Sequence, residues 1–147
     1  MKVKVYTNCD VEETLVEIHC KSETTEVKKL VNYINNSYIN LTGKKDGATF
    51  LLNLDDVYYF EAVENKVFAY LESEVYEVQY KIADLNETLK TSSFIQTSRT
   101  IILNIDKIIK IKTLVNGRIE AALLNKEKMI ISRAYANGFK YKLKGGN

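Results

Sequence analysis

The pattern of hydrophobic and polar positions predicts a chain built mostly from β-strands. After Gly47, short apolar runs alternate with polar turns, and these runs have the length and composition typical of strands. We expect strands within the following segments, in chain order: TFLLNL, VYYFEAV, VFAYLE, VYEVQY, FIQTSRTIILN, KIIKIKTLV, RIEAALL and MIIS. Asn116-Gly117 is a strong type I′ turn signal and predicts a hairpin, because both residue types tolerate positive φ.

Two short helices are expected within this β-rich region. Three apolar residues mark one side of the first helix: Ile82, Leu85 and Leu89. The second helix is expected from Arg133 to about Leu143, with Ser132 as its N-terminal cap. Gly138 lies inside this second helix and weakens it by roughly 1 kcal/mol relative to alanine, so the sequence does not define where it ends.

The first 36 residues predict a small ββα unit. MKVKVYTN and TLVEIHC alternate apolar and polar residues, which is typical of strands. A helix follows, capped by Thr24 or Thr25, and its apolar stripe recurs at helical spacing: Val27, Leu30, Val31 and Ile34. The polar stretch from Gly43 to Gly47 is the best boundary signal in the chain. We therefore expect an N-terminal ββα segment, residues 1–47, that serves dimerisation or regulation, or simply covers a sheet edge, and a second domain over residues 48–147.

Length and composition fit one globular domain with a small appendage. The chain has 147 residues, of which 46% are hydrophobic and 27% charged, as in ordinary soluble proteins. No apolar run approaches the ~20 residues that cross a bilayer. The N-terminus lacks the apolar region of a signal peptide, so we expect a cytoplasmic protein.

The sequence offers no recognisable catalytic or metal-binding motif. Cys9, Cys20 and His19 match no disulfide framework, and structural zinc usually needs four Cys or His ligands. Nucleotide-binding glycine motifs and the nucleophile elbow of hydrolases are absent. A catalytic role for His19 would require a nucleophile and an orienting partner that the sequence does not indicate. We expect no enzyme activity, no metal and no cofactor.

The net charge of +2 conceals an asymmetry along the chain. Residues 1–97 carry ten Lys and Arg against sixteen Asp and Glu, whereas residues 98–147 carry eleven against three. A basic C-terminal third on a nearly neutral protein is typical of a polyanion-binding protein. A merely solubilising surface is the alternative.

Polar groups also follow or precede strongly apolar segments at three places. They are Asn65-Lys66, Ser98-Arg99-Thr100 and Ser132-Arg133. An arginine fork can bond guanine bidentately in the major groove, lysine neutralises phosphate, and hydroxyl groups add phosphate contacts. On one edge of a β-fold, these elements would read DNA without a recognition helix. The alternative, unrelated surface loops, stays open because sequence spacing does not show whether they converge.

From about Ala48 to Leu143 the chain resembles the LytTR-type DNA-binding domain of bacterial transcription regulators, including response regulators. Three quoted stretches carry the resemblance, in order: LDDVYYFEAVENKVFAYLES, LNETLKTSSFIQTSRTIILNIDKI and NGRIEAALLNKEKMIISRAYANGFKYKL. The resemblance implies a mainly β fold with short helices (α+β), in which small antiparallel sheets present loops to successive major grooves. In this chain the ββα segment would precede that domain.

The resemblance also implies which residues bind double-stranded DNA. Arg99 and Arg133 correspond to positions that read or anchor bases, and the supporting positions, chiefly at phosphates, are Asn65, Lys66, Ser98, Thr100 and Lys140. The chain departs from the family where members often have histidine at Ser98, serine at Thr100 and arginine at Gln96. Some members have histidine at the position of Asn65, so the first loop is expected to bind mainly through Lys66.

The expected partners follow from the same resemblance. Small stand-alone LytTR regulators share this layout, which implies a homodimer on paired sites and pairing with a small membrane protein that restrains the regulator. The main rival is a basic protein-interaction module or adaptor that binds an acidic protein and lacks sequence-specific DNA binding. An enzyme is a third reading, and it would need a pocket with a perturbed acid or nucleophile.

Overall fold

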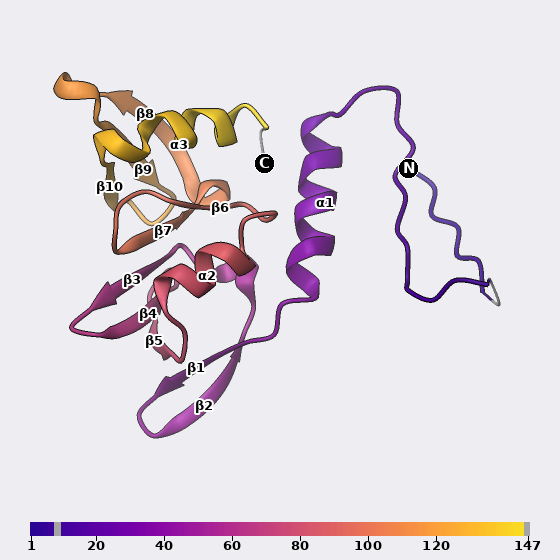
Figure 1. Cartoon of the computed structure of the whole chain (residues 1–147), viewed down its shortest axis with the longest axis horizontal. Helices are drawn as coiled ribbons and strands as arrows, with labels where there is room; N and C mark the ends of the chain where they lie inside the picture. The colour runs from indigo at the N-terminus through magenta and orange to yellow at the C-terminus, as the bar shows by residue number, and fades with distance from the viewer. Residues whose placement is uncertain (8–9, 146–147) are drawn as a thin grey trace.

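The computed structural model describes residues 1–7 and 10–145, which contain two antiparallel sheets and three α-helices (Figure 1). The helices are α1 (Thr25–Ser37), α2 (Ile82–Thr88) and α3 (Ala136–Leu143). The strands are β1 (Leu41–Lys45), β2 (Ala48–Leu52), β3 (Tyr59–Val63), β4 (Lys66–Tyr70), β5 (Val75–Val78), β6 (Phe94–Gln96), β7 (Ile101–Asn104), β8 (Ile108–Thr113), β9 (Ile119–Leu123) and β10 (Lys128–Ile131). The predicted mainly β, α+β architecture is confirmed.

Seven strands form the larger sheet, in the order β2-β1-β5-β4-β3-β7-β6. The Glu64-Asn65 turn joins β3 to β4, and both turn residues have positive φ, 49° and 65°, as the primed turns of two-residue hairpins require. The smaller sheet has the order β10-β9-β8. Its β8–β9 hairpin turns at Asn116 and Gly117, with φ of 67° and 76°, which confirms the hairpin signal read from the sequence.

Two buried clusters lie on opposite faces of the central strands β3 and β7. Phe60 and Ile102 belong to the first cluster, which includes Leu85 and Leu89 of the α2 region. The neighbouring residues Tyr59 and Leu103 belong to the second cluster, with the small sheet and Phe139 of α3. Successive side chains of a strand point to opposite faces, so the continuous apolar runs here reflect a sheet buried on both sides.

A buried polar network joins the elements around the end of β7. The side-chain amide nitrogen of Asn104 donates to the carbonyl of Val57 at 2.8 Å. Its Oδ1 accepts from Ser93 Oγ at 2.9 Å and from the backbone N–H of Asp106 at 3.1 Å.

A second polar contact involves Tyr59 of β3. The Tyr59 hydroxyl donates to Glu127 at 2.9 Å, and burial together with this bond raises the pKa of Tyr59.

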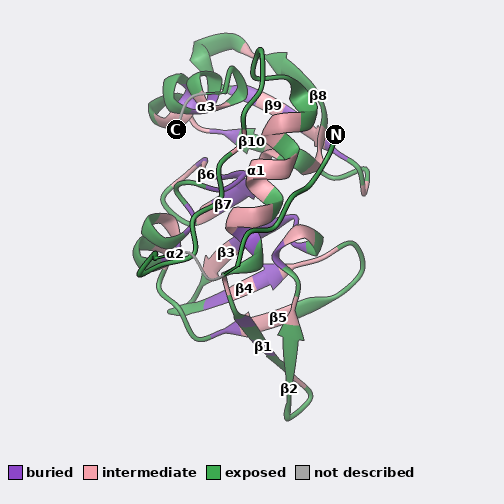
Figure 2. Cartoon of the chain, turned by 90° about the vertical axis from the view of Figure 1, so that its right-hand side faces the viewer, coloured by how far each residue is buried: buried purple, intermediate pink, exposed green. Residues whose placement is uncertain are grey.

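The predicted N-terminal ββα unit is only partly correct. The helix α1 forms as expected, and Thr24 Oγ1 accepts from the backbone N–H of Val27 at 3.4 Å. The two predicted strands before it are wrong for residues 1–7 and 10–24, which form no strand (Asn8 of the first lies outside the described residues). Alternation predicts which face of a strand is apolar, but a strand also needs a hydrogen-bonding neighbour. The described residues of this stretch are exposed except for the half-buried Ile18 (Figure 2).

The polar stretch from Gly43 to Gly47 is a hairpin and not a linker. It covers the end of β1 and the turn into β2, and β1 pairs with β5 where Lys44 lies opposite Glu77. A boundary after Gly47 therefore falls inside a hairpin whose first strand belongs to the large sheet. Turn residues have the same composition in hairpins and in linkers, so sequence alone did not separate the two.

The predicted cap of the last helix is also corrected. A short 3₁₀ turn, Arg133–Tyr135, precedes α3, and the Ser132 side chain makes no capping bond to it. The Ser132 hydroxyl instead donates to the carbonyl of Thr97 at 3.2 Å. At the other end of α3, burial lowers the pKa of Lys142, whose ammonium donates to the carbonyl of Lys90 at 2.8 Å.

Two glycine-to-alanine substitutions are expected to shift stability in opposite directions. A Cβ at the buried Gly43 would lie 2.5 Å from Tyr76 Cβ and 2.7 Å from Leu52 Cδ1, so Gly43→Ala is expected to cost about 1–3 kcal/mol. Gly138 lies in α3 with no atom within 4 Å of such a Cβ, so Gly138→Ala is expected to add up to ~1 kcal/mol. Urea unfolding of both variants measures the difference, and a stabilised Gly43→Ala would contradict the close approach of β1 to Tyr76.

Candidate nucleic-acid interface

Two of the predicted DNA-binding loops lie at the same end of the large sheet. Strand β3 pairs antiparallel with β4 and with β7, and Glu61 lies opposite Ile101. The backbone N–H of Ala62 donates to the carbonyl of Thr100 at 2.8 Å. The β3–β4 turn, which carries Asn65, and the β6–β7 turn therefore project from one end of the sheet (Figure 1).

The third predicted segment is tied to the β6–β7 turn by hydrogen bonds. The backbone N–H of Ser132 donates to the carbonyl of Thr97 at 3.0 Å, and the Ser132 hydroxyl bonds the same carbonyl. Thr97 is buried, and its backbone position is set by the pairing of β6 with β7. Arg133 follows Ser132 directly, so its backbone is held beside the turn that carries Arg99.

Side chains close the β6–β7 turn and leave its arginine exposed. Ser98 Oγ accepts from the backbone N–H of Thr100 at 3.2 Å, and Gln96 Nε2 donates to the carbonyl of Arg99 at 3.5 Å. Ser98 is half-buried, whereas Arg99 and Thr100 are exposed. Ser98 and Gln96 therefore both help to hold the turn.

The structure adds a fourth loop that the sequence reasoning missed. The β8–β9 turn lies against Arg133, because a Cβ at Gly117 would be 3.4 Å from Arg133 Cγ. Arg118 follows this turn and is exposed. The signal was present in the sequence, since an arginine directly after the Asn-Gly hairpin turn lies in the basic part of the chain. We add Arg118 to the candidate interface.

Arg99, Arg118 and Arg133 are available to bind an anion. Within residues 1–7 and 10–145, no acidic side chain forms an ion pair with Arg99, Arg118 or Arg133. The Lys66 ammonium lies 3.9 Å from a carboxylate oxygen of Glu77, and Lys66 is largely exposed. An exposed pair at this distance contributes little to stability, so a phosphate can compete for Lys66. We call the loops with Asn65-Lys66, Ser98–Thr100, Arg118 and Arg133 the loop surface.

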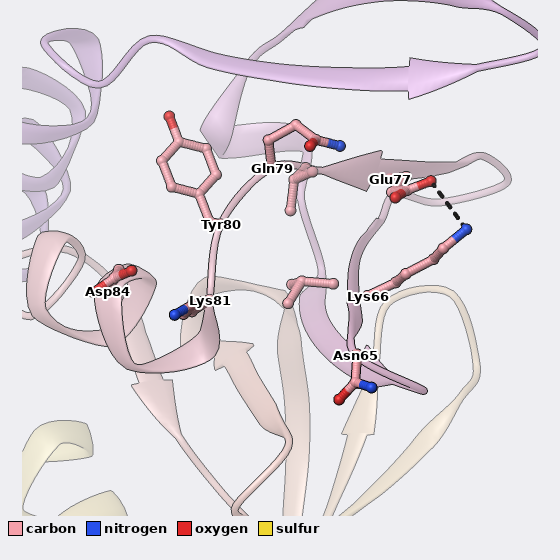
Figure 3. A pocket seen from close by; sticks show the side chains of 9 residues that line it. Asn65, Lys66, Glu77, Gln79, Tyr80, Lys81 and Asp84 are labelled. Carbon is pink, nitrogen blue, oxygen red and sulfur yellow. Dashed lines mark ion pairs between the residues drawn. The ribbon is translucent and has the colours of Figure 1, made fainter.

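Beside Asn65 and Lys66 the surface is hollowed by an open pocket of about 300 Å³ (Figure 3). Its charged lining is mixed: Lys66, Glu77, Lys81 and Asp84. Since two basic and two acidic side chains offset each other, the pocket does not define an anion site of its own. It borders the β3–β4 turn and leaves that turn open to a large ligand.

Lys140 is exposed on α3, one turn beyond Ala136, and no described contact joins it to the loop surface.

No group of three or more His, Cys, Asp or Glu that could hold a metal occurs in the described part of the chain. Among the same residues, no helix is long and apolar enough to span a membrane.

The fold and its loop surface define a DNA-binding domain of the LytTR type. The model of the LytTr DNA-binding domain family matches residues 47–144. This protein therefore belongs to the LytTR family, as its sequence motifs predicted. In a solved structure, the LytTr DNA-binding domain of a Bacillus cereus protein superimposes with a TM-score of 0.67 at 25% identity, covering 73% of this chain and 98% of that one.

Two relatives place the domain in longer and in similar-sized proteins. The sensory transduction protein LytT of Enterococcus faecalis is 30% identical over 94 residues, which is 64% of this chain but 39% of that protein. An uncharacterized HTH-type transcriptional regulator of Staphylococcus aureus (strain NCTC 8325 / PS 47) is 25% identical over 145 residues, 97% of this chain and 98% of its own length. The described helices α1, α2 and α3 are separated by strands, so they form no helix-turn-helix.

Proposed function

We propose that this protein is a sequence-specific DNA-binding transcriptional regulator that reads successive major grooves through loops at the ends of β-strands. The observation that carries the proposal is the convergence of Arg99, Arg118 and Arg133 at one end of the sheets, where all three are exposed and none has an acidic partner among residues 1–7 and 10–145. Strand pairing and backbone hydrogen bonds hold the loops in place, so little order has to be created on binding.

The residues have distinct proposed roles. Arg99 and Arg133 contact base edges, because the planar guanidinium can bond guanine O6 and N7 together. Arg118 is near enough to Arg133 to contact the same groove or the adjacent phosphates. The remaining candidate residues contact mainly phosphates and fix the register on the duplex: Asn65, Lys66, Ser98 and Thr100 of the loop surface, and Lys140 on α3 outside it.

The regulator is proposed to act in the cytoplasm as a homodimer on paired half-sites. Two-fold related subunits match half-sites that repeat at a set spacing along DNA. Pairing with a small membrane protein that restrains the regulator is part of the same proposal and depends on the family resemblance alone. No enzymatic step is assigned to the protein.

Selection of bound duplexes from a random pool tests the proposal directly. We expect enrichment of a repeated motif with a set spacing, and fluorescence anisotropy on that motif should show affinity that falls as salt rises. A scrambled duplex of the same length is the control and is expected to bind at least about 10³-fold more weakly. If the protein binds all duplexes equally and salt abolishes this binding, the result contradicts the proposal and favours a protein-interaction module.

A further inference from the structure

The residues before the LytTR domain expose an unusual amount of apolar surface. We call residues 1–24 the N-terminal arm, of which 1–7 and 10–24 are described. Its large apolar side chains are mostly in water, for example Val5 at 81% and Leu15 at 71% exposure. Seven such residues lie within the described part of this stretch: Met1, Val3, Val5, Tyr6, Val11, Leu15 and Val16. Contiguous exposed apolar surface in a folded protein marks an interaction site.

The adjoining helix α1 presents a stripe that its own domain does not cover fully. Val27, Leu30, Val31 and Ile34 are half-buried, and none of them belongs to or packs against either buried cluster of the described residues. Helix α1 is fastened at its C-terminal end, where Asn36 Nδ2 donates to Asp55 Oδ1 at 2.7 Å. Helix α1 is thus held in a defined place, and Figure 1 shows it between the sheets and the arm.

The arm has the sequence of two strands, but residues 1–7 and 10–24 form no strand. The structure gives no backbone hydrogen bond to residues 1–6 or 10–23. Its first part, residues 1–7, carries only basic charges, Lys2 and Lys4. Residues 10–24 carry five acidic residues and one lysine. A surface that presents both signs in separate halves can pair with a second copy of itself, because a two-fold axis brings the basic half of one against the acidic half of the other.

We infer that the arm and the α1 stripe together form the surface through which two copies of this chain associate. A standard interface uses about 20–30 residues on each side, which is the size of the arm with the stripe. The acidic residues 10–24 repel DNA, and Figure 1 places the arm on the opposite side of the molecule from the loop surface. Association through the arm therefore leaves the loops free. This inference refines the homodimer of the proposed function by naming its surface.

Charge exchange between the two halves of the arm tests the pairing without disturbing a core. Lys2→Glu with Lys4→Glu makes one variant. Glu12→Lys, Glu13→Lys and Glu17→Lys together make the other, because three changes are needed to turn the net charge of residues 10–24 from −4 to +2. Each variant alone has like charges in both halves and is expected to associate about tenfold more weakly or worse in sedimentation velocity. Their equimolar mixture is expected to form heterodimers with affinity near wild type. If charges paired only within one chain, mixing would restore nothing, and the inference would be overturned.

A substitution in the helix tests the stripe independently. Leu30→Glu is expected to weaken association by at least about tenfold, because a charge at the interface centre loses its hydration. Leu51→Glu is the matched control, since Leu51 is 87% exposed on β2 outside this surface, and it should associate like wild type. A wild-type protein that stays monomeric at every concentration, or a Leu30→Glu protein that dimerises normally, overturns the inference.

Binding to a single half-site separates this inference from the proposed function. The arm variants are expected to bind one half-site as wild type does, but to lose the gain in affinity on a paired site. If the wild-type protein shows no sequence preference but still associates through the arm, the proposed function is overturned and the dimer surface is not. If both charge variants keep the gain in affinity on paired sites, the dimer surface is overturned and DNA recognition is not.

Discussion

Arg133→Ala is expected to lower the affinity for the selected operator by about 5- to 150-fold, which corresponds to ~1–3 kcal/mol for one bidentate base contact. Arg133 is exposed, has no acidic partner in the described chain and follows Ser132, which is bound to the Thr97 carbonyl at 3.0 Å. Since its guanidinium makes no stabilising ion pair, the variant should unfold like wild type. The measurement is anisotropy on the operator and on duplexes with each base changed in turn.

The pattern of the loss matters more than its size. Removal of a base-reading arginine should relax preference at one operator position, whereas Lys66→Ala should weaken binding to all duplexes and reduce the salt slope by about 1. Arg133→Lys is the sharper control, because it keeps the charge and loses the planar fork; it should retain non-specific binding and still lose base preference. A uniform loss from Arg133→Ala with no change in preference would assign Arg133 to phosphates.

Arg99→Ala should follow the same pattern at a different operator position, because Arg99 lies on a separate turn. The bond of Gln96 Nε2 to the Arg99 carbonyl uses the backbone and survives the substitution. If both arginine variants relaxed the same position, the two side chains would be reading one base pair together, and their effects would not add.

Asn104→Ala is expected to destabilise the protein by about 2–4 kcal/mol, the largest change in stability predicted for this chain. Its side chain is 1% exposed and bonds Val57, Ser93 and Asp106. Alanine leaves the buried Val57 carbonyl and Ser93 hydroxyl without these partners, and each unsatisfied buried group costs about 1–3 kcal/mol. Val57 and Ser93 are themselves buried, so water cannot easily replace the lost bonds. Thermal and urea unfolding measure the effect.

Asn53 provides a matched control for Asn104. Both asparagines precede a short 3₁₀ turn and accept from the backbone N–H two residues on, Asp55 in one case and Asp106 in the other, each at 3.1 Å. Asn53 is exposed, so Asn53→Ala should cost only about 1 kcal/mol, as for an ordinary cap. Equal destabilisation by the two substitutions would show that the local turn, and not the buried network, explains the role of Asn104.

The sequence by itself determined the local structure and the family. Alternation and turn residues predicted the strands from Ala48 onward, and the hairpin turn at Asn116-Gly117 formed with both φ angles positive. The spacing of the α1 stripe predicted its helix correctly. These features succeed because they depend on neighbours within a few residues, where side-chain period and backbone sterics act directly.

Only the tertiary structure decided which segments meet. It placed β1 beside β5, so that the polar stretch Gly43–Gly47 lies in a hairpin of the large sheet, and it formed no strand over residues 1–7 and 10–24. It also brought Arg133 beside the turn of Arg99 and set Gly117 against it, which identified Arg118. These contacts join residues that are far apart in the sequence, and strand order and register determine them. The local hydrophobic pattern of a strand is the same whichever strand lies next to it, so the pattern does not predict the neighbour.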